Sequence, residues 1–175
     1  MSRGEQMKLR LLTAMAYRPE LLILDEPFSG LDPLVREELS SGLLELVGEG
    51  DWTVVIADHD VDEVERLADH AGFIARGSMQ FSESMDLLQS RFQRVTARFA
   101  AEPASNPRPP NWLMPETGNR ELRFMDQHYD SDRCRMALEQ LGPLESMEVR
   151  PATLREIFVT LTRDRREKEK REIAR

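Results

Sequence analysis

The sequence feature that most constrains the fold is a run of four apolar residues that ends in two adjacent acids. Leu21 to Leu24 are all apolar, and Asp25, Glu26 and Pro27 follow them directly. A continuous apolar run of this length predicts a strand that is buried on both faces, as in a parallel sheet. Because ligands of open α/β sheets bind at the carboxyl ends of the strands, both acids would lie where chemistry takes place. An acid there can hold Mg²⁺ in a nucleotide-hydrolysing enzyme, although a solvated acidic turn also fits these residues.

Composition narrows the possible classes of protein. Hydrophobic side chains make up 40% of the 175 residues, which suffices for one domain or for one domain with a small appendage. The net charge is −8, and the acidic excess lies in residues 1–100, which argues against nucleic acid as the main partner. A single cysteine, Cys134, excludes an intrachain disulfide and fits a reducing cytoplasm. We expect no signal peptide, and no transmembrane segment because every apolar run is far shorter than the roughly 20 residues of a membrane span.

A candidate anion site precedes the apolar run. Ser2 and Glu5 fit a capping box, which predicts a helix that ends at Arg18, before Pro19. The free backbone N–H groups and the positive dipole end of such a helix attract anions, and phosphate is the obvious one. On its own, however, this pattern is more typical of a plain helix cap.

A second apolar run repeats the arrangement of the first. Residues 53–57 predict another buried strand, and polar residues that include His59 follow it directly. A lone histidine after a strand is most often structural, so the residues alone leave the role of His59 open. The other two histidines, His70 and His128, match no pattern, and we expect them on the surface. Between the two strands Asp32 predicts the start of a helix, and residues 72–81 predict a hairpin.

Taken together, these stretches resemble the ATP-binding-cassette (ABC) family of ATPases. Residues 1–6 resemble the family's signature motif, residues 22–27 the Walker B strand with its following glutamate, and residues 29–32 the D-loop. The position of His59 matches that of the family's switch histidine. The resemblance covers residues 1–90, with Met1 in place of the usual leucine and Arg3 in place of a glycine. It implies an α/β fold that contains part of a P-loop-NTPase-like parallel sheet.

The same resemblance implies roles for individual residues, two cofactors and two partners. ATP and Mg²⁺ would be the cofactors, with Asp25 on the metal, Glu26 as the general base and His59 at the γ-phosphate. Signature and D-loop residues would contact ATP held by a second ABC subunit or communicate across that interface; these are Ser2, Gly4, Glu5, Ser29 and Asp32. A membrane permease would hold the chain at the cytoplasmic face of the cell membrane.

The character of the sequence changes after residue 90. Residues 91–163 predict a small α/β accessory region, and five prolines predict a loop at residues 101–119. Residues 148–158 resemble the end of exporter-type ABC ATPase subunits. Residues 164–175 form a charged tail, which predicts a solvated helix end, with contact to a membrane surface or to a permease as the alternative.

The phosphate-binding P-loop, Gly-x-x-x-x-Gly-Lys-Ser/Thr, does not occur in these residues. We therefore expect the C-terminal half of the ATPase subunit of an exporter, which a truncated gene, a misplaced start codon or a partial sequence would explain. The alternative is a short, non-hydrolytic partner that donates its signature face to another subunit. A chromosome-structuring or DNA-repair ATPase half is a third interpretation, against which Pro27 and the acidic residues 1–100 speak. The chain alone is expected to lack ATPase activity and to self-associate through uncovered apolar surface.

Overall fold

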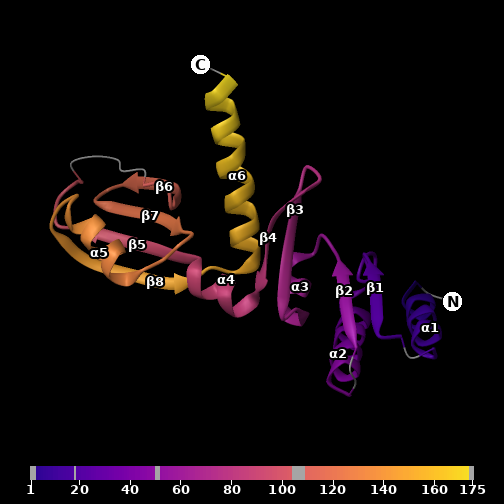
Figure 1. Cartoon of the computed structure of the whole chain (residues 1–175). Coiled ribbons are helices and arrows are strands. Elements are labelled where there is room, and N and C mark those ends of the chain that lie inside the picture. The colour runs from indigo at the N-terminus through magenta and orange to yellow at the C-terminus, as the bar shows by residue number, and fades with distance from the viewer. Residues whose placement is uncertain (1–2, 18, 50–51, 104–108, 174–175) are drawn as a thin grey trace. The chain divides into compact units, whose positions relative to one another are not determined.

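The computed structural model describes residues 3–17, 19–49, 52–103 and 109–173, which form two compact units. The N-terminal unit is Met1–Ala68 and the C-terminal unit is Asp69–Arg175. Both units combine helices with strands, so the fold is mixed α/β, as the sequence predicts (Figure 1). The domain boundaries expected after residues 90 and 163 stay predictions.

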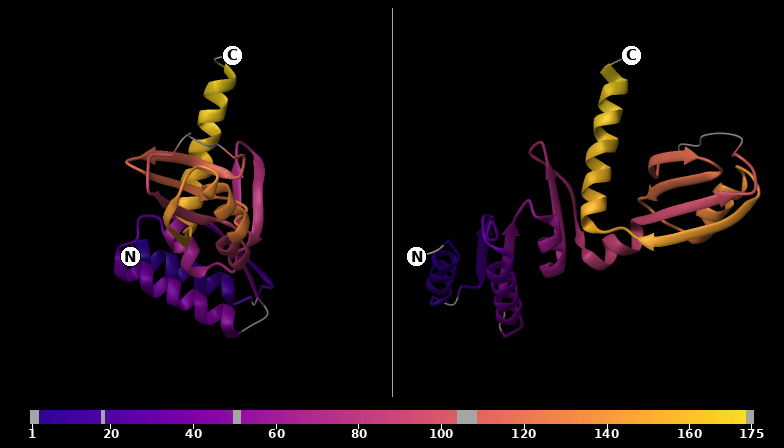
Figure 2. Two further views of the ribbon diagram at one scale, coloured as in Figure 1. Left: turned by 90° about the vertical axis from the view of Figure 1, so that its left-hand side faces the viewer. Right: turned by 180° about the vertical axis from the view of Figure 1, so that it is seen from behind.

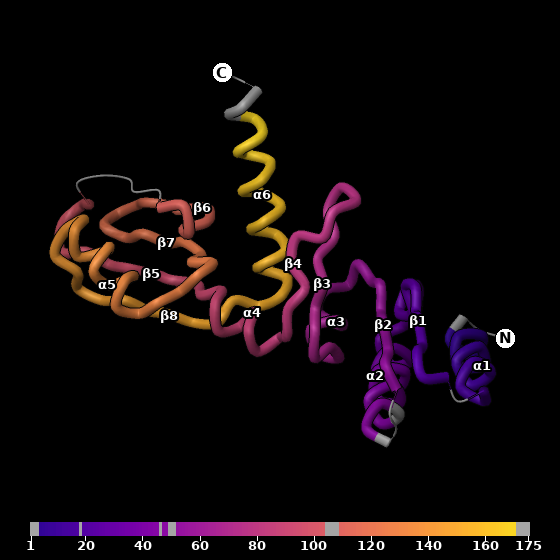
Figure 3. Tube along the Cα trace, in the orientation of Figure 1, coloured from indigo at the N-terminus to yellow at the C-terminus, as the bar shows by residue number. Residues whose placement is uncertain are grey.

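Two parallel strands and three helices form the described part of the N-terminal unit. Its elements, traced in Figure 3, are α1 (Arg3–Met15), β1 (Leu21–Asp25), α2 (Pro33–Glu49), β2 (Thr53–Ala57) and α3 (Val61–Leu67). Strands β1 and β2 pair in parallel, with Leu21 opposite Thr53 and Asp25 opposite Ala57. The two predicted strands are therefore confirmed, and their carboxyl ends lie at the same edge of the sheet.

The sheet of the N-terminal unit buries only one of its two faces. Leu22 and Leu24 lie in an apolar cluster between the sheet and helices α1 and α2. The other buried members of this cluster are Leu11, Phe28, Leu39 and Leu43. Ile23 and Val55 point to the opposite face, where Ile23 is 67% exposed. The expectation that these strands are buried on both faces is wrong for the described residues, because both helices cover the same face and no described element of this unit covers the other.

The C-terminal unit contains a hairpin and a four-stranded antiparallel sheet. Its elements are β3 (His70–Ala75), β4 (Ser78–Ser84), α4 (Met85–Arg91), β5 (Gln93–Phe99), β6 (Trp112–Gly118), β7 (Glu121–Asp126), α5 (Ser131–Glu139), β8 (Leu144–Pro151) and α6 (Leu154–Ile173). Strands β3 and β4 form the predicted hairpin, while the larger sheet has the strand order β6-β7-β5-β8. Figure 2 shows this sheet and the long helix α6 from two further sides.

The core of the C-terminal unit lies between one face of the larger sheet and helix α5. Val95, Phe99 and Phe124 of the sheet are buried together with Cys134 and Leu138 of the helix. Burial raises the pKa of the Cys134 thiol to about 11, because an apolar environment disfavours the charged thiolate. The single cysteine is therefore a core residue of this unit.

The loop expected at residues 101–119 is shorter than the prolines suggest. Strand β6 occupies residues 112–118 at the edge of the sheet, so the prediction of a loop is wrong for these residues. Pro115 is accommodated because an edge strand needs hydrogen bonds on one side only, and because the pairing with β7 shifts register between Leu113 and Glu116. Residues 104–108 of the expected loop lie outside the described residues.

Helix α6 begins with a capping box and includes the described part of the charged tail. The Thr153 hydroxyl accepts a hydrogen bond from the Glu156 N–H at 3.2 Å, and the Glu156 carboxylate accepts one from the Thr153 N–H at 3.1 Å. Ion pairs such as Lys168–Asp164 at 2.6 Å stabilise the exposed turns that follow. Among the described residues, none of the helices combines the length and the apolar character that crossing a membrane requires.

Candidate functional site

The turn after β1 holds Glu26 in an uncommon backbone conformation. Asp25 is the last residue of the strand and is exposed, and the Glu26 N–H donates a hydrogen bond to the carbonyl of Ala57 at 2.7 Å. Glu26 has a φ of 50°, in the left-handed region that residues other than glycine seldom adopt. Pro27 and Phe28 are buried directly after it and anchor the turn. Such strained positions are found preferentially at functional sites.

The structure brings the two predicted catalytic residues into contact. Nδ1 of His59 lies 2.5 Å from Oε2 of Glu26, within hydrogen-bond distance. Both side chains remain accessible, because His59 is 74% exposed and Glu26 is 44% exposed. Since Glu26 follows β1 and His59 follows β2, the parallel pairing of these strands accounts for their proximity. A carboxylate and an imidazole in this contact can exchange or share a proton.

Asp58 is a member of this cluster that the sequence interpretation did not assign. Its side chain has no exposed surface, and one of its oxygens, Oδ1, lies 3.5 Å from Nδ1 of His59. Oδ1 also accepts a hydrogen bond from the N–H of Asp60 at 2.9 Å. The other oxygen, Oδ2, is buried and has no hydrogen-bond partner among the described residues. We call the trio of Glu26, Asp58 and His59, whose potential ligand atoms lie within 4.8 Å of one another, the acid–histidine cluster.

The predicted D-loop residues lie in the tight turn that leads into α2. The Ser29 N–H donates a hydrogen bond to the Glu26 carbonyl at 3.2 Å, and Ser29 itself is exposed. Oδ1 of Asp32 accepts hydrogen bonds from the N–H groups of Leu34 and Val35, both at 3.1 Å. Asp32 therefore caps α2, as the sequence predicts, and its role in communication between subunits stays a prediction.

The signature residues lie at the start of α1. Among the described residues, none of them belongs to the acid–histidine cluster. Gly4 is buried in the first turn, and a Cβ atom on it would lie 2.6 Å from Cγ1 of Val35 in α2. Close packing of the two helices thus accounts for glycine at this position. Glu5 is exposed in the same turn. Ser2 lies outside the described residues, so its predicted phosphate contact stays a prediction.

The donor set at the carboxyl edge of the sheet fits Mg²⁺ bound together with a nucleotide. Asp25 and Glu26 present exposed carboxylates, and Asp58 adds a buried oxygen without a partner among the described residues. Magnesium typically keeps several waters and binds one or two carboxylates together with substrate phosphates. The predicted metal residue, Asp25, is not a member of the acid–histidine cluster.

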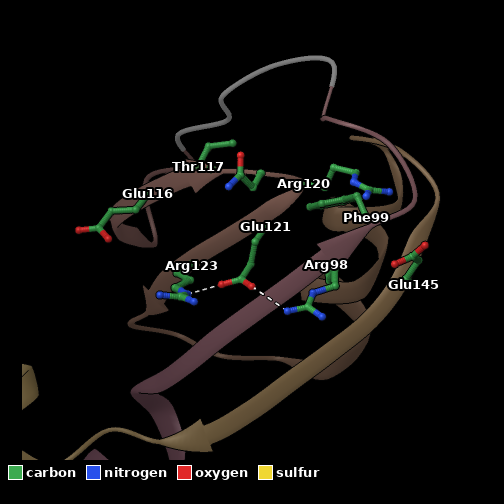
Figure 4. Close-up of a pocket in the computed structure, with 10 residues that line it drawn as sticks. Arg98, Phe99, Glu116, Thr117, Arg120, Glu121, Arg123 and Glu145 are labelled. Carbon is green, nitrogen blue, oxygen red and sulfur yellow. Dashed lines mark hydrogen bonds and ion pairs between the residues drawn. The ribbon is translucent and has the colours of Figure 1, made fainter.

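A cavity of about 730 Å³ in the C-terminal unit has a different character (Figure 4). It lies beside the turn between β6 and β7, and none of the predicted site residues lines it. Glu121 accepts a hydrogen bond from Arg98 at 3.2 Å and contacts Arg123 on its other side. The hydrogen bond from Arg98 lowers the pKa of Glu121 most, and the hydrogen bond from Arg123 lowers it further. Three charged side chains that line this cavity, Arg98, Glu121 and Arg123, are thus paired with one another.

Known proteins resemble the chain over part of its length. No protein-family model matches it. An ABC transporter ATP-binding protein of Alkalihalophilus pseudofirmus is 42% identical over 78 residues, which are 45% of this chain and 29% of the relative. The bacitracin transport ATP-binding protein BcrA of Bacillus licheniformis is 38% identical over 129 residues, which are 74% of this chain and 37% of the relative. These relatives support the family of ABC transporter ATP-binding proteins.

The ATP-binding protein of an importer matches the chain as well. The phosphate import protein PstB 2 of Lactobacillus johnsonii is 29% identical over 56% of this chain and 39% of the relative. The chain therefore spans only about a third of the length of the ABC relatives it matches. A solved structure of the ATP-binding subunit of an ABC transporter is 28% identical, with a TM-score of 0.46 over 51% of this chain and 37% of that chain.

Proposed function

We propose that the chain forms part of an ATP-hydrolysing subunit of an ABC-type exporter. The observation that carries this proposal is the contact between Glu26 and His59 at the carboxyl ends of two adjacent parallel strands. Ligands of open α/β sheets bind at this edge. The relatives that match the chain are ATP-binding proteins of transporters, in agreement with this interpretation.

Glu26 and His59 would divide the work of ATP hydrolysis between them. A carboxylate with one oxygen held by an imidazole can use its second oxygen to accept a proton from the attacking water. General-base catalysis of this kind contributes about 10²–10⁴ in rate. His59 would stabilise the negative charge that develops on the γ-phosphate, an electrostatic role that its exposed ring leaves it free to take.

The remaining predicted residues would serve cofactor binding and assembly. Asp25 would hold Mg²⁺ directly or through water, and bound Mg²⁺ supplies charge neutralisation at the phosphates. Ser2, Gly4 and Glu5 would approach ATP held by a second ABC subunit, while Ser29 and Asp32 would lie at the interface between the subunits. A membrane permease would then place the chain at the cytoplasmic face of the cell membrane.

Export rather than import is supported by the C-terminal part of the sequence. Residues 148–158 resemble the end of exporter-type subunits, and they form the end of β8 and the start of α6.

A second candidate function is that of a non-hydrolytic partner that donates only its signature face. It is supported by the resemblance of residues 1–6 to the signature motif, which acts on ATP held by another subunit. In this alternative the ATP that is hydrolysed belongs entirely to another subunit, and Glu26 has no role in its turnover.

ATP hydrolysis in reconstituted mixtures tests the proposal. We expect the purified 175-residue chain to show no Mg²⁺-dependent turnover above background by itself. Combined with a P-loop-bearing ABC subunit, wild type should support turnover that falls by about 10²-fold or more in Glu26→Gln. Glu45→Gln, an exposed acid of α2, is the matched control and should leave turnover unchanged.

Two outcomes separate the candidates. Stimulated turnover that is insensitive to Glu26→Gln would contradict the catalytic role and support the signature-donating partner. A P-loop motif found in frame in the DNA that precedes the codon for Met1 would support the ATPase interpretation, whereas a stop codon there would favour the alternative.

A further inference from the structure

The acid–histidine cluster carries a feature that ATP hydrolysis by Glu26 and His59 leaves unexplained. The side chain of Asp58 is completely buried, and its Oδ2 has no hydrogen-bond partner among the described residues. A buried carboxylate oxygen without a partner is costly, and such groups are normally paired or bound to a metal ion. Nη1 of the cation Arg36 pairs with Oδ2 of Asp60 at 2.7 Å.

Two further potential ligands lie beside the Asp58 carboxylate, next to its other oxygen, Oδ1. Nδ1 of His59 lies 2.5 Å from Oε2 of Glu26 and 3.5 Å from Oδ1 of Asp58, so the imidazole nitrogen stands between two carboxylates. The three potential ligand atoms lie within 4.8 Å of one another. Ligands at about 2.1 Å from a tetrahedral ion lie roughly 3.4 Å apart. A small adjustment of the exposed Glu26 and His59 side chains around the fixed Asp58 would therefore complete the geometry.

We infer that Glu26, Asp58 and His59 bind one divalent transition-metal cation of the zinc class, in addition to any Mg²⁺ that arrives with nucleotide. An imidazole nitrogen with two carboxylates suits Zn²⁺ and its neighbours in the first transition row, whereas Mg²⁺ prefers oxygen ligands alone. Three protein ligands leave a fourth position for water, as in open zinc sites. The exposed faces of His59 and Glu26 provide the entry path for the ion.

Binding of this cation would replace the hydrogen bond between Glu26 and His59. Both side chains would then be withdrawn from the roles proposed above, and the metal would act as an inhibitor of hydrolysis. That consequence rests on the proposed function, whereas the binding itself does not. The decisive measurement is therefore made on the chain without nucleotide.

Calorimetric titration of the metal-free 175-residue chain with Zn²⁺ tests the site. Wild type should bind one ion per chain, and Co²⁺ in place of Zn²⁺ should give the visible absorption of a low-coordinate site with a nitrogen ligand. His59→Ala should weaken binding by at least about 10-fold, since loss of an outer-shell partner alone costs about 10–100-fold in known metal sites. Asp58→Asn should have a similar effect, while its remaining carbonyl oxygen can still accept the hydrogen bond from Asp60.

The chain offers matched controls for each ligand type. His70→Ala and His128→Ala remove the other two histidines, and Cys134→Ser removes the single thiol; all three should leave Zn²⁺ binding unchanged. Circular dichroism verifies that each variant is folded, and His59→Ala keeps the test decisive if Asp58→Asn does not fold, because His59 is largely exposed. Absence of stoichiometric binding, binding retained in His59→Ala, or binding lost in one of the controls would overturn the inference.

Discussion

Oε2 of Glu26 and Nδ1 of His59 lie 2.5 Å apart although 33 positions separate the two residues in the chain. The contact depends on the register of β1 and β2, which places Asp25 opposite Ala57 and so brings the following residues side by side. It also depends on the left-handed backbone of Glu26, with its φ of 50°. The site is thus built from one sheet edge and one strained residue.

The strain at Glu26 gives a prediction about stability. Glu26→Gly relieves a left-handed conformation that costs about 1–2 kcal/mol, while added freedom of the unfolded chain costs about 0.4–1 kcal/mol. We expect a net increase in the free energy of unfolding of roughly 0.5 kcal/mol, measured by urea denaturation, because the exposed contact with His59 contributes little. Glu45→Gly in α2 should instead destabilise by about 1 kcal/mol, the ordinary cost of glycine in a helix. Equal destabilisation by both variants would refute the strain at Glu26.

The close approach of α1 and α2 predicts an unfavourable Gly4→Ala substitution. A Cβ atom at this position would lie 2.6 Å from Cγ1 of Val35, so the helices must separate or Val35 must move. We expect a loss of about 1–3 kcal/mol in thermal or urea unfolding. Gly42→Ala is the control, because its Cβ meets nothing within 4 Å and it should stabilise α2 by about 1 kcal/mol. When Val35 is already replaced by alanine, Gly4→Ala should cost much less stability. If it costs as much as in wild type, the contact with Val35 is not the cause.

The start of α6 predicts a contribution to stability that acid removes. The hydrogen bonds from Arg150, at 2.6 and 2.8 Å, followed by that from the Thr153 amide, lower the pKa of Glu156 from 4.5 to about 2. Because the folded-state pKa lies below the unfolded one, ionised Glu156 contributes stability above about pH 4.5, and this contribution is lost as the pH falls toward 2.

Glu156→Gln should therefore cost about 1 kcal/mol at pH 7, an amount reduced by solvent screening of the partly exposed pair. The difference from wild type should shrink between pH 4.5 and pH 2 in a series of urea melts. Glu148→Gln, an exposed acid of β8, should show neither the loss at pH 7 nor the change with pH. A Glu156→Gln effect that is constant down to pH 2 would argue against the ion pair as its cause.

The uncovered face of the N-terminal sheet predicts self-association. Ile23 and Val55 are exposed on neighbouring strands, and an apolar patch of this kind favours contact with a second apolar surface. The Ile23→Thr/Val55→Thr double variant should shift the isolated chain toward monomer in sedimentation velocity experiments, without unfolding it. Leu34→Thr is the control, because Leu34 is 70% exposed but lies on α2 rather than on the sheet. A wild-type chain that is monomeric at high concentration would contradict the prediction.

The sequence pattern predicted the elements that are defined by nearby residues. The apolar runs predicted β1 and β2, and the Asp32 cap predicted the start of α2. Each of these features depends on interactions within a few residues of the chain.

Features that depend on distant residues could not be read in the same way. Strand β6 forms despite Pro115 because β7 supplies its hydrogen bonds, and the prolines of residues 101–119 hide that pairing. The Asp58 side chain is buried only because its neighbours in space enclose it. In the sequence, Asp58 therefore looks like any other acid at the end of a strand. Which face of the β1–β2 sheet is exposed likewise depends on which face the helices cover. A run of apolar residues in the sequence does not show that.

The order of the strands in the larger sheet has a consequence for synthesis. Strand β5 pairs with β7 on one side and with β8 on the other, and β8 is the last strand of the chain. On the ribosome, β5 and the β6–β7 hairpin emerge first, with one edge of β5 still unpaired. The sheet can close only after Pro151 has left the exit tunnel, so the nascent C-terminal unit carries an open strand edge until the whole of β8 has emerged.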